Sequence, residues 1–215
     1  MMWVKICGIT RGEDASLAAR LGVQAVGFVL WPGSRRFIKP AEAKAIARDL
    51  PPSVTPVGVF VDQRFEHVTA IAQLVGLGAV QLHGSESAEY CSRVNAPVIK
   101  AVAVGEGFCP SSLTDLPPIV TLLLDAADLA VHGGTGRTVD WAIASQVART
   151  RRTILAGGLT PGNVAAAIRA VQPYGVDVSS GVERFPGVKH EDRLRRFLEE
   201  VRACCAGAEG DAGPD

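Results

Sequence analysis

Short apolar runs rich in Val, Ile and Leu recur at fairly regular intervals along the chain. In chain order they are WVKIC, QAVGFVL, TPVGVFV, GAVQLH, PVIKAVAV, IVTLLLDA, RTILAGG and YGVDVSS. Most of them are continuously apolar and do not alternate with polar residues, which is typical of strands buried on both faces of a parallel sheet. The pattern therefore predicts a parallel sheet and disfavours an antiparallel sandwich.

Segments with helical periodicity separate these runs. We expect helices at 13–21, 40–49, 64–74, 86–93, 139–148, 161–171 and 190–203, and a weaker one near 111–116. Strand and helix thus alternate along the chain, which favours closure into a barrel over an open doubly wound sheet. The expected fold class is α/β, a single (β/α)₈ TIM barrel whose eight strands are the eight apolar runs.

One domain accounts for the chain. Its length of 215 residues lies near the lower end for such a barrel, and no change of composition marks a linker. We expect the barrel to span 1–203. The segment 204–215 is rich in Gly, Ala and Asp and has no apolar periodicity, which predicts a disordered C-terminal tail.

Composition narrows the class of partner. Hydrophobic residues make up 47% of the chain and charged residues 20%, which suits one large core. The 22 basic residues balance the 22 acidic ones, so no overall field attracts nucleic acid or an anionic membrane. We expect a small-molecule partner and neither nucleic acid nor membrane, and both a monomer and a homodimer remain open.

The N-terminal segment, the cysteines and the histidines bear on where the protein is located and on whether it has disulfides or a metal site. The N-terminal segment lacks the apolar stretch of a signal peptide, and no later run approaches membrane-spanning length, which predicts a cytoplasmic protein. The five cysteines are odd in number and show no CxxC spacing, so we expect free thiols. The histidines share no metal-binding spacing with one another or with a carboxylate, so no metal is expected.

Two reactive side chains stand at the ends of predicted strands, where an α/β barrel builds its active site. Cys7 ends WVKIC and is followed by Gly8, which admits a tight turn and the close approach of a ligand. Asp125 follows VTLLL, where an unpaired carboxylate is costly unless it faces the barrel mouth or a donor. We interpret both as functional, against the alternatives of a buried structural cysteine and a capping aspartate.

Three glycine-rich segments follow the last three predicted strands. They are GGTG (133–136), AGGL (156–159) and SSGVE (179–183). Glycine lets backbone N–H groups point at phosphate oxygens, and the loops after the last two strands hold phosphate in many barrels. Their convergence on one rim predicts a phosphate site.

A basic loop and one histidine are further candidates for binding an anionic substrate. Arg35, Arg36 and Lys39 lie in PGSRRFIKP, after the second predicted strand. Guanidinium suits bidentate recognition of carboxylate, and a solvated basic loop is the alternative. His83 ends VQLH and is either a polar residue of the rim or a ligand contact.

The motifs taken together closely resemble the phosphoribosylanthranilate isomerase family of tryptophan biosynthesis. They are KICGIT, GFV followed by PGSRR, GVFV, VQLHG, LLLDA, GGTGRTVDW, AGGLTPGNV and VDVSSGVE. The resemblance runs from Val4 to about Leu198. Other phosphate-binding barrels share the glycine loops but not the KICGIT cysteine together with the LLLDA aspartate.

The resemblance implies an Amadori rearrangement of N-(5-phosphoribosyl)anthranilate to 1-(2-carboxyphenylamino)-1-deoxyribulose 5-phosphate, without a cofactor or metal. It implies that Asp125 is the general acid that opens the ribose ring, that Cys7 is the general base at C2′, and that Arg36 binds the anthranilate carboxylate. The other substrate-binding residues implied, most of them in the phosphate pocket, are His83, Gly134, Gly136, Gly157, Gly158, Asp177, Ser180 and Gly181.

Ordinary pKa values constrain these two roles. A thiol with a pKa near 8.5 needs a depression of about 1.5 units, roughly 2 kcal/mol, to be mostly thiolate at pH 7. An aspartate near 3.9 needs a rise of about three units, near 4 kcal/mol, to remain the acid. Asp125 therefore needs the more unusual environment, and we expect Lys5 or a backbone dipole to hold the thiolate of Cys7.

Two alternatives remain open. One is another sugar-phosphate isomerase or epimerase barrel, including one that also acts in histidine biosynthesis. Two-substrate barrels usually need phosphate sites on both halves, whereas the glycine-rich loops here gather in the second half. The other is a barrel that only binds a phosphorylated ligand, for which loss of Cys7 or Asp125 would be expected, and both are present.

Overall fold

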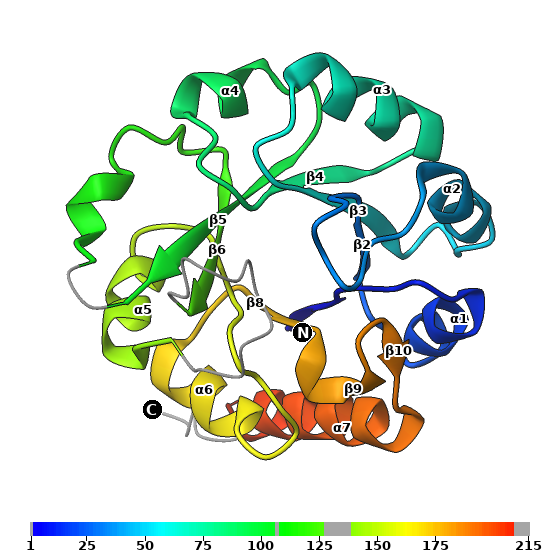
Figure 1. Cartoon of the computed structure of the whole chain (residues 1–215). Coiled ribbons are helices and arrows are strands. Elements are labelled where there is room, and N and C mark those ends of the chain that lie inside the picture. The colour runs from blue at the N-terminus through cyan, green and yellow to red at the C-terminus, as the bar shows by residue number, and fades with distance from the viewer. Residues whose placement is uncertain (1, 106–107, 127–138, 209–215) are drawn as a thin grey trace.

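The computed structural model describes residues 2–105, 108–126 and 139–208, and its centre is a closed barrel of parallel strands in the order β1 to β8 (Figure 1). The strands are β1 (Trp3–Ile6), β2 (Ala25–Val29), β3 (Thr55–Phe60), β4 (Ala79–Leu82), β5 (Val98–Val104), β6 (Thr121–Ala126), β7 (Thr153–Leu155) and β8 (Gly175–Val178). Each corresponds to one of the apolar runs. Closure of the barrel, which the sequence favoured over an open sheet, is confirmed by the pairing of β1 with β8.

Helices ring the outside of the barrel (Figure 1). They are α1 (Gly12–Arg20), α2 (Pro40–Arg48), α3 (Phe65–Val75), α4 (Ala88–Arg93), α5 (Trp141–Ala148), α6 (Val164–Val171) and α7 (Glu191–Ala208). A short 3₁₀ helix, η1 (Pro110–Leu113), takes the place of the weak helix expected near 111–116. None of the described helices is long and apolar enough to cross a bilayer.

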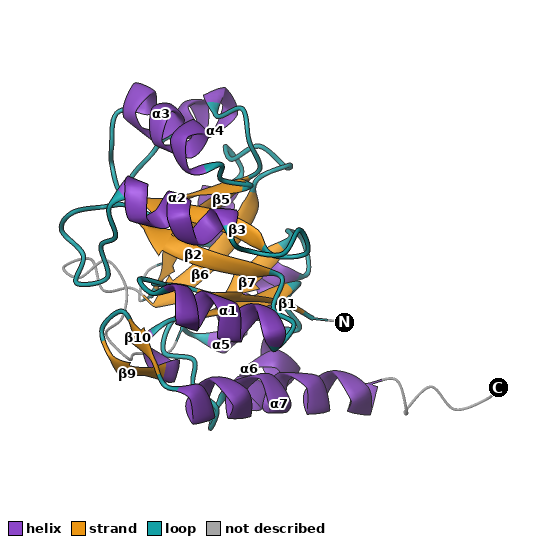
Figure 2. Cartoon of the chain, turned by 90° about the vertical axis from the view of Figure 1, so that its right-hand side faces the viewer, coloured by secondary structure: helices purple, strands orange, loops and turns teal. Residues whose placement is uncertain are grey.

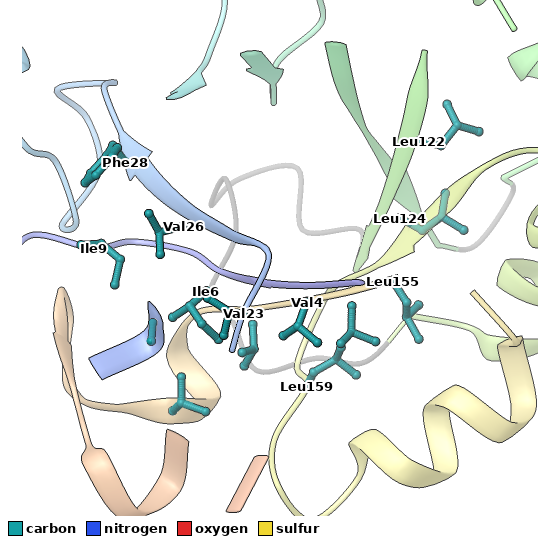
Figure 3. Close-up of a cluster of buried hydrophobic side chains, with 14 of the residues drawn as sticks. Val4, Ile6, Ile9, Val23, Val26, Phe28, Leu122, Leu124, Leu155 and Leu159 are labelled. Carbon is teal, nitrogen blue, oxygen red and sulfur yellow. The ribbon is translucent and has the colours of Figure 1, made fainter. Parts of the chain in front are cut away.

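Side chains of each strand alternate between two apolar layers. Leu122 and Leu124 of β6 belong to the outer layer between the strands and the helices, which Figure 3 shows together with Val4 and Ile6 of β1. Leu123 points instead into the barrel interior. Because the alternation has a period of two, Asp125 faces the interior with Leu123, and Cys7 faces it with Lys5.

A hairpin at the mouth of the barrel was not expected from the sequence. After β8 the chain forms a 3₁₀ turn, η2 (Ser180–Val182), and then the antiparallel strands β9 (Glu183–Phe185) and β10 (Val188–Lys189). Figure 2 shows this hairpin at the end of the barrel opposite to the C-terminal end of α7. The strands are very short and contain charged residues, so they give no hydrophobic signal.

The end of α7 corrects the predicted start of the tail. The helix continues through Ala208, so the prediction of disorder is wrong for 204–208, and 209–215 lie outside the described residues. Alanine and cysteine are compatible with a helix, and the Cys204 thiol lies 3.6 Å from the carbonyl oxygen of Ala165 on α6. This packing extends the helix beyond the point where its apolar periodicity fades.

Candidate active site

A pocket opens at the C-terminal ends of the strands. The side chains and backbone that line it include eight residues named from the sequence: Cys7, Arg36, His83, Asp125, Gly157, Gly158, Asp177 and Ser180. Gly181 follows Ser180 in the turn η2. The predicted residues Gly134 and Gly136 lie outside the described residues.

Cys7 is held in a buried, charged environment on the β1 side of the pocket. Its backbone N–H donates to the carbonyl oxygen of Val178 at 2.9 Å, which continues the pairing of β1 with β8 beyond the strands. Beneath it, the ammonium of Lys5 lies 2.8 Å from Asp177 Oδ2, and the Lys5 side chain is fully buried. The sequence placed Lys5 on the same strand face as Cys7 but gave no sign of the pairing with Asp177.

The pKa of the Cys7 thiol lies above its ordinary value. Burial is the main cause of this rise, the positive charge of Lys5 opposes it, and the negative charge of Asp177 adds to it. The Lys5 charge works in the expected direction, but burial and Asp177 outweigh it.

Asp125 stands in a more open environment on the other side of the pocket. Its Oδ1 accepts a hydrogen bond from the backbone N–H of Ala126 at 2.8 Å. Its Oδ2 lies 3.3 Å from Nε2 of His83, and both side chains are 16% exposed. His83 Nδ1 in turn lies 2.9 Å from the Nε2 amide of Gln81, so His83 is fixed from both sides of its ring.

Gly157 makes room for this carboxylate. It has a φ of +75°, and a Cβ at this position would lie 2.9 Å from Asp125 Oδ1 and 2.6 Å from the backbone nitrogen of Ala126. A side chain here would therefore be strained and would displace Asp125. The sequence assigned Gly157 to the phosphate, whereas its contacts in the structure are with Asp125.

Arg36 lies at the pocket edge and is bound by Glu183 of the hairpin. Its Nε and Nη2 donate to the Glu183 carboxylate at 2.9 and 2.7 Å, a bidentate contact. Glu183 is only 5% exposed and also accepts from Lys189 Nζ at 2.9 Å. Burial alone would raise the pKa of Glu183, but the hydrogen bonds from Arg36 and the charge of Lys189 lower it. The other two basic residues of the loop, Arg35 and Lys39, are exposed and do not line the pocket.

Sequence reasoning missed Glu183 as a site residue. The glycine of the segment SSGVE predicted a phosphate loop. No spacing in the sequence could reveal that Glu183 in this segment contacts an arginine 147 residues away. The signal that existed was a glutamate directly after a predicted phosphate loop, which is weak because most glutamates are solvated.

The loops after β7 and β8 meet at the rim, as the glycine pattern predicted. The carbonyl oxygen of Leu159 occupies the space where a Cβ of Gly181 would be, so only glycine allows this approach. Asn163, at the start of α6, donates to the Gly158 carbonyl at 2.9 Å and accepts from the Thr160 N–H at 2.8 Å. These bonds fix the loop after β7 beside the N-terminus of α6, where the helix dipole favours an anion.

Three buried polar atoms of the pocket have no hydrogen-bond partner among the described residues. They are Gln81 Oε1, Asp177 Oδ1 and Ser179 Oγ. An unpaired buried polar group costs about 1–3 kcal/mol. Their common location indicates a pocket built to bind a polar ligand with several hydrogen-bonding groups.

Ser179 is a second residue that the sequence did not single out. In the described part of the chain, no group of three His, Cys, Asp or Glu side chains is placed to hold a metal ion.

Comparisons with known proteins show the family of this chain. A family model described as N-(5′-phosphoribosyl)anthranilate (PRA) isomerase matches residues 4–200. The chain is 46% identical over 198 residues to the N-(5′-phosphoribosyl)anthranilate isomerase of Pelobacter propionicus, covering 92% of this chain and 94% of that one.

Solved structures show the same relationship. Phosphoribosyl anthranilate isomerase from Thermotoga maritima superposes with a TM-score of 0.87 at 42% identity, covering 94% of this chain and all of that one (100%). A phosphoribosyl anthranilate isomerase in complex with reduced 1-(o-carboxyphenylamino)-1-deoxyribulose 5-phosphate has a TM-score of 0.84 at 42% identity, with coverage of 94% and 100%. The match of nearly the whole chain in sequence and in structure means that this protein belongs to the N-(5′-phosphoribosyl)anthranilate isomerase family.

Proposed function

We propose that this protein catalyses the Amadori rearrangement of N-(5-phosphoribosyl)anthranilate to 1-(2-carboxyphenylamino)-1-deoxyribulose 5-phosphate, a step of tryptophan biosynthesis. The observation that carries this proposal is that Cys7 and Asp125 line one pocket, together with the glycine-rich loops after β7 and β8. The reaction needs a proton donor, a proton acceptor and an anchor for phosphate at one place. We also propose the cytoplasm as its location.

Asp125 and Cys7 take the two proton-transfer roles. Asp125 protonates the ring oxygen of the furanose, the bond from C1′ to that oxygen breaks, and the anthranilate nitrogen forms an iminium with C1′. Cys7 then removes the proton from C2′, and the electrons of that bond neutralise the iminium to give an enolamine. The enolamine tautomerises to the ketone product, so the reaction rearranges atoms without oxidant or reductant.

The raised pKa of Cys7 adds a condition to this scheme, with burial its largest cause. The reactive pair, an aspartic acid and a thiolate, holds one proton in total, as does the pair of a carboxylate and a thiol. A proton that moves from the thiol to the carboxylate converts the second pair into the first without exchange with solvent. The positive iminium then stabilises a thiolate beside it by charge attraction.

The rest of the pocket binds the two anionic ends of the substrate. Glu183 engages Nε and Nη2 of Arg36, and we assign the Nη1 amino group to the anthranilate carboxylate. Backbone N–H groups of Gly158 and of the turn containing Ser180 and Gly181, next to the N-terminus of α6, are the phosphate anchor. His83 acts through Asp125, whose Oδ2 lies 3.3 Å from His83 Nε2.

The direct test follows the fluorescence decay of freshly generated phosphoribosylanthranilate as purified protein is added. We expect Cys7→Ala and Asp125→Asn each to lower kcat at least about 100-fold while KM changes little, because general acid or base catalysis contributes roughly 10²- to 10⁴-fold. Cys109→Ser is the matched control, because this cysteine is exposed and does not line the pocket, and it should retain full activity. Wild-type protein without activity above the uncatalysed rate would refute the assignment, and an active variant would remove that residue from the mechanism.

A further inference from the structure

A buried ion pair lies directly below Cys7 inside the barrel. Lys5 and Asp177 are register partners on β1 and β8, and their side chains are 0% and 7% exposed. Taking two charges out of water costs several kcal/mol each, which their attraction repays only with good geometry. A pair of apolar residues would fill the same interior space without this cost, so the stability of the barrel does not explain the pair.

The contact between this pair and the thiol is close. Lys5 donates a hydrogen bond to Asp177, and its positive charge also acts on the Cys7 thiol beside it. Both ends of the contact lie over Gly27 of β2, where a Cβ would stand 2.9 Å from Cys7 Sγ and 3.0 Å from Lys5 Nζ. Gly27 thus leaves the space in which the ammonium and the thiol meet.

Asp177 also reaches the pocket. Its Oδ2 is bound to Lys5, whereas its Oδ1 is buried, has no partner among the described residues and belongs to a residue that lines the pocket beside Cys7. The Asp177 carboxylate therefore contacts Lys5 in the barrel interior and also borders the place where substrate binds. This position lets Asp177 influence the thiol through space while it orients Lys5.

Other charged groups around Cys7 are engaged in contacts of a different kind. Lys189 donates to the Cys7 and Ser179 carbonyl oxygens and to Glu183, and Arg36 is held by the same glutamate. Asp125 is bound by His83. The contacts of Lys189 thus fix the backbone of Cys7, whereas the ammonium of Lys5 lies beside its thiol over Gly27.

We propose that Lys5 and Asp177 are positioning residues that hold the Cys7 thiol over Gly27 and set the pH at which it loses its proton. The cation favours the thiolate and the anion disfavours it, so the two residues act in opposite directions on one group. The consequence for catalysis rests on the proposed role of Cys7 as the base. The effect on the thiol itself does not depend on that role.

The experiment measures the rate at which iodoacetamide alkylates Cys7 in the free full-length protein as a function of pH. Mass spectrometry of the peptide containing Cys7 separates its signal from those of the other cysteines. We expect Asp177→Asn to lower the pH of half-maximal alkylation by about one unit and Lys5→Met to raise it by about one unit, the scale of a neighbouring charge. The double variant Lys5→Met/Asp177→Asn should return towards the wild-type value.

Opposite shifts support the proposal, whereas two unchanged values, or two shifts in the same direction, overturn it. Thermal melts by circular dichroism show which variants fold. If Lys5→Met does not fold, the pH of half-maximal alkylation should still be higher in the double variant than in Asp177→Asn. Equal values in these two variants would overturn the proposal.

The pH profile of kcat/KM separates this proposal from the proposed function. If Cys7 is the base, the limb of the profile that it controls moves with the alkylation half-point in each variant. Shifted alkylation with an unmoved limb would leave the role of the ion pair intact and would instead remove Cys7 as the base.

Discussion

Cys7 and Asp125 lie on two sides, or walls, of one pocket, and the residues that surround them differ. The wall around Cys7, built from β8, β1 and the hairpin, contains the buried charges of Lys5, Asp177, Glu183 and Lys189. The wall around Asp125 contains His83, Gln81 and the backbone of Gly157. The thiol is thus controlled by charges that are fixed before substrate arrives, whereas the carboxylate is controlled by hydrogen bonds and by its half-open position.

This difference adds to the expectation from ordinary pKa values. Those values gave Asp125 the more demanding task, yet the structure concentrates its buried charges around Cys7. Burial raises the pKa of the thiol, so this group needs activation as well. We therefore expect the loss of a hydrogen bond to reduce activity more in the Cys7 wall, with its fixed charges, than in the more open Asp125 wall.

The largest effect is expected at Gly157, in the Asp125 wall. Gly157→Ala should lower kcat about 100-fold, because a methyl group would displace the carboxylate from its position and misplacement by about 1 Å costs roughly that factor. Steady-state kinetics in the fluorescence assay measure it. Gly12→Ala is the control, because nothing lies within 4 Å of a Cβ at Gly12, and its kcat should be unchanged. Wild-type kcat in Gly157→Ala would mean that Asp125 does not act from the position seen here.

The next largest effect is expected at Glu183, in the Cys7 wall. Glu183→Gln keeps the shape but removes the charge that holds Arg36, so KM should rise about 10-fold with a smaller change in kcat, since Arg36 is assigned to substrate binding. The free energy of unfolding should also fall, by about 3–5 kcal/mol, because Lys189 is left without its buried anion. Glu191→Gln is the control, since its ion pair with Arg195 is exposed, and it should change neither quantity. An unchanged KM would contradict the assignment of Arg36.

The same glutamate predicts how stability depends on pH. Its pKa is lowered in the folded protein, so its contribution is fully present above the ordinary value of about 4.3 and is lost as the pH falls through the lower folded value. Urea unfolding midpoints of the wild type should therefore fall in this acid range. Glu183→Gln should flatten that fall, and two parallel curves would show that Glu183 is not linked to acid unfolding.

The strands, and the position of Cys7 and Asp125 at one pocket, could be predicted because each depends on local sequence. Continuous apolar runs specify buried parallel strands, and the alternation of Leu122, Leu123 and Leu124 decides that Asp125 faces the interior. The hairpin could not be predicted, because its strands are too short to show a period. Contacts such as Lys5 with Asp177 or Arg36 with Glu183 join distant parts of the chain, and a single sequence contains no record of them.

The boundaries show the same limit. Helix α6 begins at Val164 rather than 161, because Asn163 uses its side chain to close the turn that precedes it. Helix α4 begins at Ala88 rather than 86, because Ser87 caps it by accepting from the Tyr90 N–H. Both outcomes depend on which of several polar side chains wins a hydrogen bond, and this competition is decided by the three-dimensional surroundings.

The smallest effect is expected at His83, which completes the comparison. His83→Ala removes the polar contact between His83 Nε2 and Asp125 Oδ2. If this contact contributes as much as one hydrogen bond, about 0.5–1.5 kcal/mol, kcat should fall roughly 2- to 10-fold with little change in KM. His83→Gln keeps a donor and should restore part of the loss, while His67→Ala, an exposed change on α3, should have no effect. A loss of 100-fold or more in His83→Ala would show that the Asp125 wall depends on a proton carried by His83, and the two walls would then be equally demanding.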